Sequence, residues 1–309
     1  MRGGAAEHVD TVTADGAGVV DPPCPDSDVR GAQMGFTEGR TDSAPPDTTS
    51  PGGGVAERLD DARLARRLAE SAGRVLLELR REQADLEPAA LKAAGDERSQ
   101  QHLAAELERH RPTDAVLSEE AADDASRLGA DRVWIIDPLD GTREFSEIPR
   151  EDWAVHVALW QDGELVAGAV SRPAMGDTLA TDEPPTVPAP VDGPIRLAVS
   201  RTRPPAFVTA LAERLGAELV PMGSAGVKAT AVLDGTVDAY VHAGGQFEWD
   251  SAAPVAVARS AGLHTSRIDG SPLRYNQSDP RLPDLVVCRP EHAEHLLTVI
   301  DELTKGEEQ

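Results

Sequence analysis

The alternation of hydrophobic and polar positions predicts helices and an antiparallel sheet in the first half of the chain. Apolar residues recur at helical spacing over residues 55–81, and a second helix is expected from about Glu97 to Arg109. The apolar run at residues 133–136 is typical of a buried strand. Residues 153–160 alternate, and residues 165–171 follow after a short polar turn, which indicates a hairpin. We expect this half to be an α+β subdomain with antiparallel pairing.

Strand and helix patterns alternate in the second half of the chain, which predicts an α/β subdomain. These segments are, in order, residues 195–199, 206–215, 218–220, 225–233, 237–242 and 251–261. Residues 181–194 hold five prolines and suit a linker between the halves. The beginning of the chain is rich in Gly, Pro, Asp, Ser and Thr and predicts a disordered acidic tail. The predicted division is a tail at 1–55, an N-terminal subdomain at 56–190 and a C-terminal subdomain at 191–309.

The most informative motif follows the apolar strand of the first half. Pro138 cannot donate to a strand ladder, so we expect the chain to leave the sheet there, with Asp137 and Asp140 at the sheet rim. Carboxylates with water and substrate phosphate are the ligands that Mg²⁺ prefers. Gly141 lets the backbone approach a ligand, Thr142 can cap the next turn, and free N–H groups there favour an anion. The loop predicts a metal and phosphate site, and the alternative is an ordinary Asp-rich turn.

Further acids stand beside predicted strand ends or helix starts, namely Asp96, Glu119, Glu120 and Asp250. If they converge on the loop, two or three cations could bridge phosphate oxygens and activate a water molecule. Glu119 and Glu120 follow a short predicted strand at 115–117 and could instead be a helix cap or a solvated pair. Asp250 opens a helix of small residues and could simply be its N-cap.

Two segments of the second half could hold an anion. Gly223 and Ser224 form a glycine-rich helix start before Lys228, one of three lysines in the chain. The alternative there is an ordinary turn and cap. Arg201 and Arg203 follow a predicted strand and could bind a second phosphate, or they could be solvated.

Composition and charge narrow the classes of function. The 309 residues carry a formal net charge of -24, which excludes a nucleic-acid polymer as partner because duplex binding needs clustered cations. No apolar run approaches the length of a membrane span and no apolar signal core begins the chain, so a cytoplasmic location is expected. Cys24 and Cys288 are the only cysteines and argue against a disulfide framework. His156 and His242 lie inside strand patterns and are expected to be packed or surface residues.

Three motifs, taken in this order, resemble the lithium-sensitive, Mg²⁺-dependent phosphatases of the inositol monophosphatase superfamily. They are Ser118-Glu119-Glu120, the loop WIIDPLDGT, and Trp249-Asp250-Ser251-Ala252-Ala253. The similarity spans about residues 56 to 303. The run Gly141-Thr142-Arg143-Glu144-Phe145 and the segment HAGGQFEWDSAAPVAVARSAGLHTSRIDGSPLRYNQ are similar to the branch of CysQ-type 3′(2′),5′-bisphosphate nucleotidases. The resemblance implies a layered αβαβα sugar-phosphatase fold.

The resemblance also implies roles for individual residues. The implied Mg²⁺ ligands are Glu119, Asp137, the Leu139 carbonyl, Asp140 and Asp250. Gly141 and Thr142 would hold the phosphate, and Thr142 with Asp96 would orient the attacking water. Asp96 ends the segment Leu91-Lys92-Ala93-Ala94-Gly95-Asp96, in which the family's usual context is changed. The residues expected to face the nucleotide are Arg201, Gly223, Ser224 and Lys228.

The implied activity is the Mg²⁺-dependent removal of the 3′-phosphate from 3′-phosphoadenosine 5′-phosphate, or from its sulfated form, in sulfur assimilation. One alternative is the same chemistry on inositol phosphates or fructose 1,6-bisphosphate. Another, from a different class, is a catalytically silent protein that binds a nucleotide. A homodimer is expected by analogy with the family alone.

Overall fold

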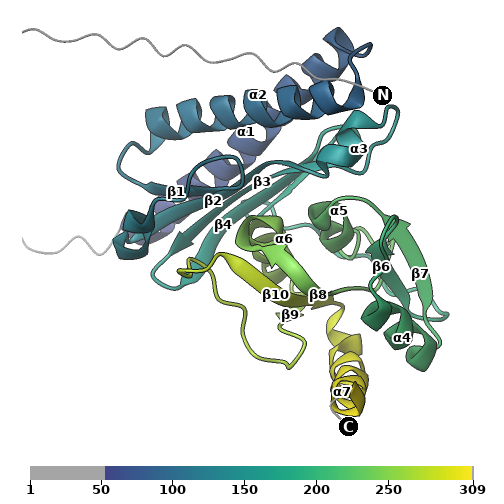
Figure 1. Ribbon diagram of the computed structural model, residues 1–309. Helices are drawn as coiled ribbons and strands as arrows, with labels where there is room; N and C mark the ends of the chain where they lie inside the picture. Colours follow the sequence, from purple (N-terminus) through teal and green to yellow (C-terminus); the bar gives the residue numbers. More distant parts are fainter. Residues whose placement is uncertain (1–52, 308–309) are drawn as a thin grey trace, which may run out of the picture. The chain divides into compact units, whose positions relative to one another are not determined.

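Two five-stranded sheets form the frame of the chain in the computed structural model, which describes residues 53–307 and the side chains of residues 60–305 (Figure 1). The first sheet has the order β1-β2-β3-β4-β5, and only β1 and β2 run parallel. Its strands are β1 (Ala115–Ser118), β2 (Arg132–Asp140), β3 (Ala154–Gln161), β4 (Glu164–Arg172) and β5 (Asp177–Ala180). The predicted hairpin is confirmed as β3 and β4, and most of this sheet is antiparallel as expected.

The second sheet has the order β7-β6-β8-β10-β9. Its strands are β6 (Arg196–Ser200), β7 (Glu218–Met222), β8 (Ala239–Phe247), β9 (His264–Ser266) and β10 (Arg281–Cys288). Strands β7, β6 and β8 are parallel, whereas β10 is antiparallel to both β8 and β9. The parallel part arises from strands and helices that alternate along the chain, as the sequence pattern predicted.

Helices lie in three layers about the two sheets. They are α1 (Gly53–Glu82), α2 (Pro88–His110), α3 (Thr142–Ser146), α4 (Ala206–Leu215), α5 (Ala225–Thr230), α6 (Glu248–Ser260), α7 (Pro290–Glu307) and the 3-10 helix η1 (Ala125–Gly129). Helices α1 and α2 cover the outer face of the first sheet, α5 and α6 lie between the sheets, and α4 and α7 cover the outer face of the second (Figure 1). This succession is the predicted αβαβα fold.

Strand β2 shows how one strand serves two hydrophobic cores. Trp134 and Ile136 point into the core beneath α1 and α2, whereas Val133 and Ile135 point into the core between the sheets. Successive side chains of a strand alternate between its faces, so a strand covered on both sides reads as a continuous apolar run. The buried strand predicted at residues 133–136 is therefore confirmed.

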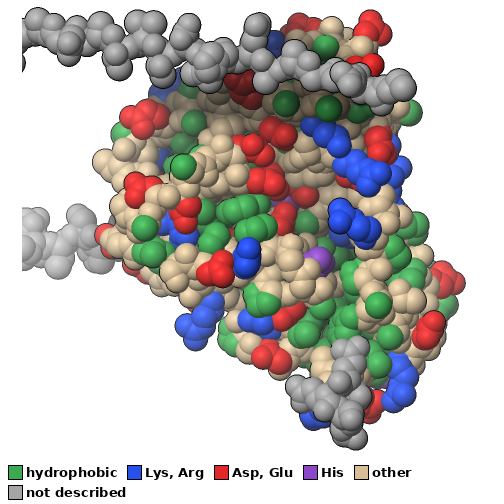
Figure 2. Space-filling model, viewed as in Figure 1, with side chains coloured by type: hydrophobic (Ala, Val, Ile, Leu, Met, Phe, Trp, Pro, Cys, Tyr) green, Lys and Arg blue, Asp and Glu red, His purple; other side chains and the backbone are tan. Residues whose placement is uncertain are grey.

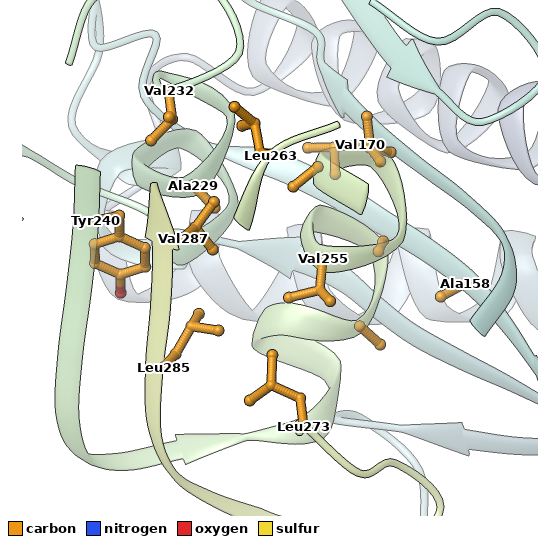
Figure 3. Close-up of a cluster of buried hydrophobic side chains, with 14 of the residues drawn as sticks. Ala158, Val170, Ala229, Val232, Tyr240, Val255, Leu263, Leu273, Leu285 and Val287 are labelled. Carbon is orange, nitrogen blue, oxygen red and sulfur yellow. The ribbon is translucent and has the colours of Figure 1, made fainter. Parts of the chain in front are cut away.

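The middle layer depends on small side chains. Ala253 and Ala256 of α6 are buried against the first sheet, and a Cβ added to Gly168 of β4 would lie 2.6 Å from the Cβ of Ala256. Larger residues complete this core on the side of the second sheet, among them Leu285 and Val287 of β10 (Figure 3). The glycine and the alanines thus allow α6 to lie close to β4. This close packing sets the position of the first turn of α6.

Pro138 does not take the chain out of the first sheet, so that prediction is wrong. Strand β2 continues to Asp140, and its pairing with β3 shifts register between Asp137, opposite His156, and Asp140, opposite Ala154. An extra residue on β2 produces this bulge, and a bulge is one of the few places where a strand tolerates proline. The bulge turns the two aspartates toward one end of the sheet.

Helix α2 begins at Pro88, well before the predicted start near Glu97. Its buried positions include Gly95 and Ser99, and these two residue types do not produce the apolar periodicity from which a helix is predicted. Proline suits the first turn of a helix because its missing N–H needs no partner there. Asp96 therefore lies inside a helix and not ahead of one.

Other boundaries differ from the predictions by smaller amounts. Helix α1 begins at Gly53, α5 ends at Thr230 instead of 233, and α6 begins at Glu248 instead of 251. Strand β8 continues past residue 242 because Gly244 and Gly245 adopt positive φ within it. No prediction covered β5, β9 or α7.

Part of the predicted domain division cannot be compared with the structure. The tail predicted at 1–55 lies outside the described residues except for its last three, and Cys24 lies in that part. A boundary near residue 190 stays a prediction. Among residues 53–307, no helix has both the length and the apolar character that crossing a membrane requires.

We predict that Asp238→Asn destabilises the protein in a pH-dependent way. Asp238 is buried between β6 and β8, where it accepts hydrogen bonds from the Arg196 N–H (2.9 Å) and guanidinium (2.8 and 3.0 Å) and lies 3.3 Å from Arg289. Burial alone would raise the pKa of Asp238, but Arg196 outweighs it and holds the pKa below its ordinary value. At pH 7 the free energy of unfolding should fall by roughly 3 kcal/mol.

A carboxylate with a lowered pKa stabilises the fold above its unfolded pKa and loses this effect as pH falls through its folded pKa. The difference between wild type and Asp238→Asn in urea unfolding should therefore stay constant from pH 7 to about 5 and narrow below about 4. A difference that is the same at every pH would contradict this explanation.

Candidate metal and phosphate site

Three aspartates converge where the first sheet meets the middle layer. Asp137 and Asp140 come from the bulged end of β2, and Asp250 comes from the first turn of α6. Their ligand atoms all lie within 4.8 Å of one another. Figure 2 shows acidic side chains gathered in the centre of the visible face, between the helical layer of α2 and the region of α6. We call these three residues the acidic trio.

The first turn of α6 holds Asp250 in place. Phe247, not Asp250, is the N-cap, and the Asp250 Oδ2 atom accepts a hydrogen bond of 2.7 Å from the Phe247 N–H. One carboxylate oxygen thus closes the helix turn, as a residue at the third helical position can do. The predicted role of Asp250 as the N-cap is therefore wrong, because Asp250 lies three residues inside the helix. Its second carboxylate oxygen, Oδ1, remains for a ligand.

Among the described residues, too few positively charged groups lie near the acidic trio to offset the negative charges of its carboxylates. Burial, and then repulsion from Glu119, Asp140 and Asp250, raises the pKa of Asp137 well above its ordinary value. Burial and the charge of Asp140 raise the pKa of Asp250 to about 6. A cluster of carboxylates with raised pKa values and oxygen donors at short range fits a hard divalent cation. The residues present therefore suit the metal that the sequence motifs implied.

Glu119 lies just beyond β1 at the exposed side of the trio. Desolvation, and then repulsion from Asp250, Asp140 and Glu120, raises the pKa of Glu119 to about 7. Glu119 is thus close enough to the trio to share its electrostatic field, although its oxygens are not among the ligand atoms within 4.8 Å of one another. Its role as a metal ligand stays a prediction.

Asp140 differs from its neighbours because the N-terminus of α5 neutralises it. Its Oδ2 accepts hydrogen bonds from the Ser224 hydroxyl and from the Gly226 N–H (2.6 Å), and its Oδ1 accepts one from the Ala225 N–H (3.0 Å). Burial acts to raise the pKa of Asp140, but His156, Lys228 and Ser224 together hold it below the ordinary value. Asp140 therefore stays ionised within a cluster that otherwise resists ionisation.

His156 was missed as part of the site, since the sequence suggested only a packed or surface residue. It is buried in β3, with Nε2 3.2 Å from the Asp140 Oδ2 and Nδ1 3.0 Å from the Trp249 carbonyl oxygen. A Cβ on Gly226 would lie 1.9 Å from Nε2, so α5 approaches the ring closely. A polar residue in an otherwise apolar strand, next to the aspartate strand, was the available signal.

The predicted water-orienting pair is brought together by α2. Thr142 Oγ1 lies 3.3 Å from the Asp96 Oδ1 and 3.0 Å from the Leu139 carbonyl oxygen. Burial, and then the charge of Glu120, raises the pKa of Asp96 to about 6. The helix is anchored to the loop at Ser99, whose hydroxyl donates to the Pro138 carbonyl at 2.6 Å.

Close packing keeps this part of α2 in register with the loop. A Cβ added to Gly95 would lie 2.7 Å from Phe145 and 2.8 Å from Leu139. Gly141, at φ +84°, is the N-cap of α3, so the expectation that Thr142 caps this turn is wrong, and the backbone of Gly141 lies close to Ser224. Glycine is needed at both positions, for space at Gly95 and for the left-handed conformation at Gly141.

Four residues predicted to face the nucleotide have partners within the protein. The Gly223 N–H donates to Asp152 at 2.6 Å, and Ser224 donates to Asp140. Lys228 is buried and donates to the carbonyl oxygens of Gly223 (3.3 Å) and Ser224 (2.5 Å). Arg201 is paired with Glu144 (2.8 Å) and Glu147 (2.5 Å). Their contacts with a substrate stay predictions.

A pocket of about 420 Å³ lies at the ends of β6 and β8. Lys228 lines it, and burial lowers the pKa of the Lys228 ammonium although the charges of Asp140, Glu144 and Asp250 act in the opposite direction. The other polar residues of its wall include Ser200, Arg203, His242 and Gln246. Basic side chains also gather over α3 and α5 in Figure 2. We call this cavity the leaving-group pocket.

Comparison with known proteins agrees with this geometry. Residues 59–305 match the inositol monophosphatase family, and the chain belongs to that family. A Mycobacterium leprae protein named 3′-phosphoadenosine 5′-phosphate phosphatase is 54% identical over 257 residues, which cover 79% of this chain and 95% of that protein. A Mycobacterium bovis protein of the same name is 54% identical over 237 residues, with 74% and 89% covered.

Solved structures of the same family share the fold. CysQ from Bacteroides thetaiotaomicron has a TM-score of 0.62 and 27% identity, covering 75% of this chain and 97% of that one. An IMPase from Thermotoga maritima has a TM-score of 0.63 and 20% identity, covering 80% and 99%. The latter comparison bears on the fold alone.

We predict that Asp137→Asn stabilises the metal-free protein and removes its response to Mg²⁺. The substitution takes one charge out of a repelling cluster, so the metal-free free energy of unfolding should rise by about 1 kcal/mol. Wild-type protein should melt at a higher temperature when Mg²⁺ is added, because the ion binds only the folded state.

The matched control is Asp131→Asn, which removes an exposed charge away from the trio and should behave as wild type in both conditions. An Asp137→Asn protein that is less stable than wild type without metal, and that Mg²⁺ still stabilises fully, would contradict the metal assignment.

Proposed function

We propose that the chain is a Mg²⁺-dependent phosphatase that removes the 3′-phosphate of 3′-phosphoadenosine 5′-phosphate. The observation that carries this proposal is the acidic trio together with a polar pocket lined by Lys228 and Arg203. Lys228 links the two, because it donates to the carbonyl oxygen of Ser224, whose hydroxyl donates to Asp140. The trio suits cations that bind a phosphate, and the pocket suits an anionic leaving group. The names of the relatives at 54% identity support the same substrate.

In this proposal two or three Mg²⁺ ions are held by the acidic trio, Glu119 and the Leu139 carbonyl. When bound, Mg²⁺ supplies positive charge that offsets the negative charge spreading over the phosphoryl oxygens. The backbone at Gly141 and Thr142 receives the phosphate at the start of α3. Because α3 follows the bulge directly, the phosphate and the acidic trio share one rigid support.

Asp96 and Thr142 orient the attacking water. When the Thr142 hydroxyl donates to Asp96, its oxygen lone pairs are free to accept a proton from a water molecule. The water oxygen attacks the phosphorus in line, and the bond between the phosphorus and the 3′-oxygen breaks. The water's proton passes through Thr142 to Asp96, and the departing 3′-oxygen takes a proton from a second water beside Asp250.

The leaving-group pocket receives the rest of the nucleotide. Arg203 is exposed at its wall and has no carboxylate partner among the described ion pairs, so it can meet the 5′-phosphate. Lys228 contributes positive charge from within the wall, although its own hydrogens are used by the turn before α5. These two cations favour a bisphosphate over a substrate with a neutral leaving group.

The direct test is phosphate release from a substrate panel with and without Mg²⁺. We expect the highest kcat/KM for 3′-phosphoadenosine 5′-phosphate, lower values for inositol 1-phosphate and fructose 1,6-bisphosphate, and inhibition by Li⁺ at fixed Mg²⁺. Asp140→Asn should lower kcat by at least about 1,000-fold, because it removes a ligand charge from the reacting centre. A preference for an inositol phosphate, or an active Asp140→Asn enzyme, would overturn the proposal.

A second test concerns the 5′-phosphate. Arg203→Ala should lower kcat/KM for 3′-phosphoadenosine 5′-phosphate roughly tenfold through the loss of a charged contact, and should leave hydrolysis of 3′-AMP, which lacks the 5′-phosphate, nearly unchanged. Arg214→Ala is the control, since Arg214 is exposed on α4 and pairs with Glu302. An equal loss of kcat/KM on both substrates would show that Arg203 does not contact the 5′-phosphate.

A further inference from the structure

One polar group in the leaving-group pocket has no partner in the protein. Gln246 lies near the end of β8, and only 6% of the residue is exposed. Its amide nitrogen donates a hydrogen bond of 2.8 Å to the Tyr240 hydroxyl. Its amide oxygen, Oε1, is buried, and no donor among the described residues reaches it. Buried acceptors are nearly always satisfied in folded proteins, so an unpaired one in a pocket points to a ligand.

Apart from the Tyr240 hydroxyl, which already contacts the amide nitrogen, the donors around Gln246 are directed to other acceptors. Tyr240 lies beneath Lys228, with the Lys228 Nζ 5.5 Å from the ring centroid. The Lys228 ammonium is directed to the carbonyl oxygens of Gly223 and Ser224. His242, on the same strand, has its Nε2 3.0 Å from the Gly244 carbonyl oxygen. The protein thus holds the amide by its nitrogen and leaves its oxygen without a partner, in a residue that lines the pocket.

The position of Gln246 relates it to the reacting end of the substrate. It precedes Asp250 by four residues across the junction of β8 and α6. Phe247, the next residue, donates its N–H to the Asp250 Oδ2 at 2.7 Å. Lys228, which lines the pocket, donates to the carbonyl oxygen of Ser224, and the Ser224 hydroxyl donates to Asp140. The pocket wall at Gln246 is therefore next to the acidic trio. In the proposed function, the sugar that carries the scissile phosphate would be the part of the nucleotide closest to that wall.

We propose that Gln246 is a specificity-determining residue that hydrogen-bonds the sugar hydroxyl next to the scissile phosphate. For a 3′-phosphorylated ribonucleotide this is the 2′-hydroxyl, so the inference rests on the proposed function. A hydroxyl can donate to Oε1, which a phosphate oxygen cannot do. A hydroxyl can also accept a hydrogen bond. The contact therefore persists if the Gln246 amide rotates by 180° and places its nitrogen where the oxygen was. The enzyme thereby distinguishes ribose from deoxyribose through one neutral contact.

The test compares 3′-phosphoadenosine 5′-phosphate with its 2′-deoxy analogue in wild type and in Gln246→Met, which keeps the side-chain length but has no amide. Wild type should prefer the ribose substrate by roughly 10- to 100-fold in kcat/KM, because the deoxy analogue leaves a buried acceptor unpaired. In Gln246→Met this ratio should fall to about 1, through a loss on the ribose substrate only. Retained activity on the deoxy analogue shows that the variant is folded.

Gln277→Met is the matched control, because Gln277 is an exposed glutamine whose amide bonds the Tyr275 carbonyl outside the pocket. It should keep the wild-type ratio. A wild-type ratio in Gln246→Met, or an equal loss on both substrates, would overturn the assignment.

A binding measurement separates this inference from the proposed activity. Calorimetry with adenosine 5′-monophosphate and its 2′-deoxy form should show the same dependence on Gln246, whether or not phosphate is released. If neither substrate is hydrolysed but the binding difference disappears in Gln246→Met, the proposed reaction is wrong and the role of Gln246 stands. If wild type binds the two nucleotides equally, the role of Gln246 is refuted.

Discussion

The constraint on which the structure depends is the repulsion among carboxylates at the end of β2. Asp137 and Asp140 are buried there beside Asp250, an arrangement that is unfavourable without positive charge close by. The protein supplies this charge for one member only, because the N-terminus of α5 and His156 surround Asp140. Bound cations would supply positive charge for the other two. The buried carboxylates therefore destabilise the metal-free fold, and cation binding would offset this loss of stability, as is common at functional sites.

The layered packing makes this concentration of charge possible. The acidic residues come from the first sheet and from a middle-layer helix, and Asp140 is capped by a second middle-layer helix. Small residues at Gly168 and Gly226 bring those helices close enough to β3 and β4 for the side chains to meet. Larger residues there would separate the layers and spread the charges. The alanine-rich character of α6 is thus a requirement of the site as well as of the core.

The sequence predicted those features that depend on local pattern. The buried strands, the βα alternation and the place of Asp137 and Asp140 at the end of a strand could be predicted, because periodicity and residue type express them directly. It did not predict that Pro138 stays in the sheet, because a bulge depends on the partner strand. The early start of α2 was hidden because its buried face uses Gly95 and Ser99. The contacts of His156 with Asp140 and Trp249 were missed because they involve residues far away in sequence, and no single segment carries that information.

The chain belongs to a phosphatase family. We propose that fixed charges at the acidic trio and in the leaving-group pocket promote its reaction. The most direct test of the central claim is to locate the metal itself. Crystals grown with Mn²⁺ in place of Mg²⁺ should show anomalous scattering peaks in contact with Asp137, Asp140 and Asp250. Peaks elsewhere on the protein, with none at these three carboxylates, would contradict the account.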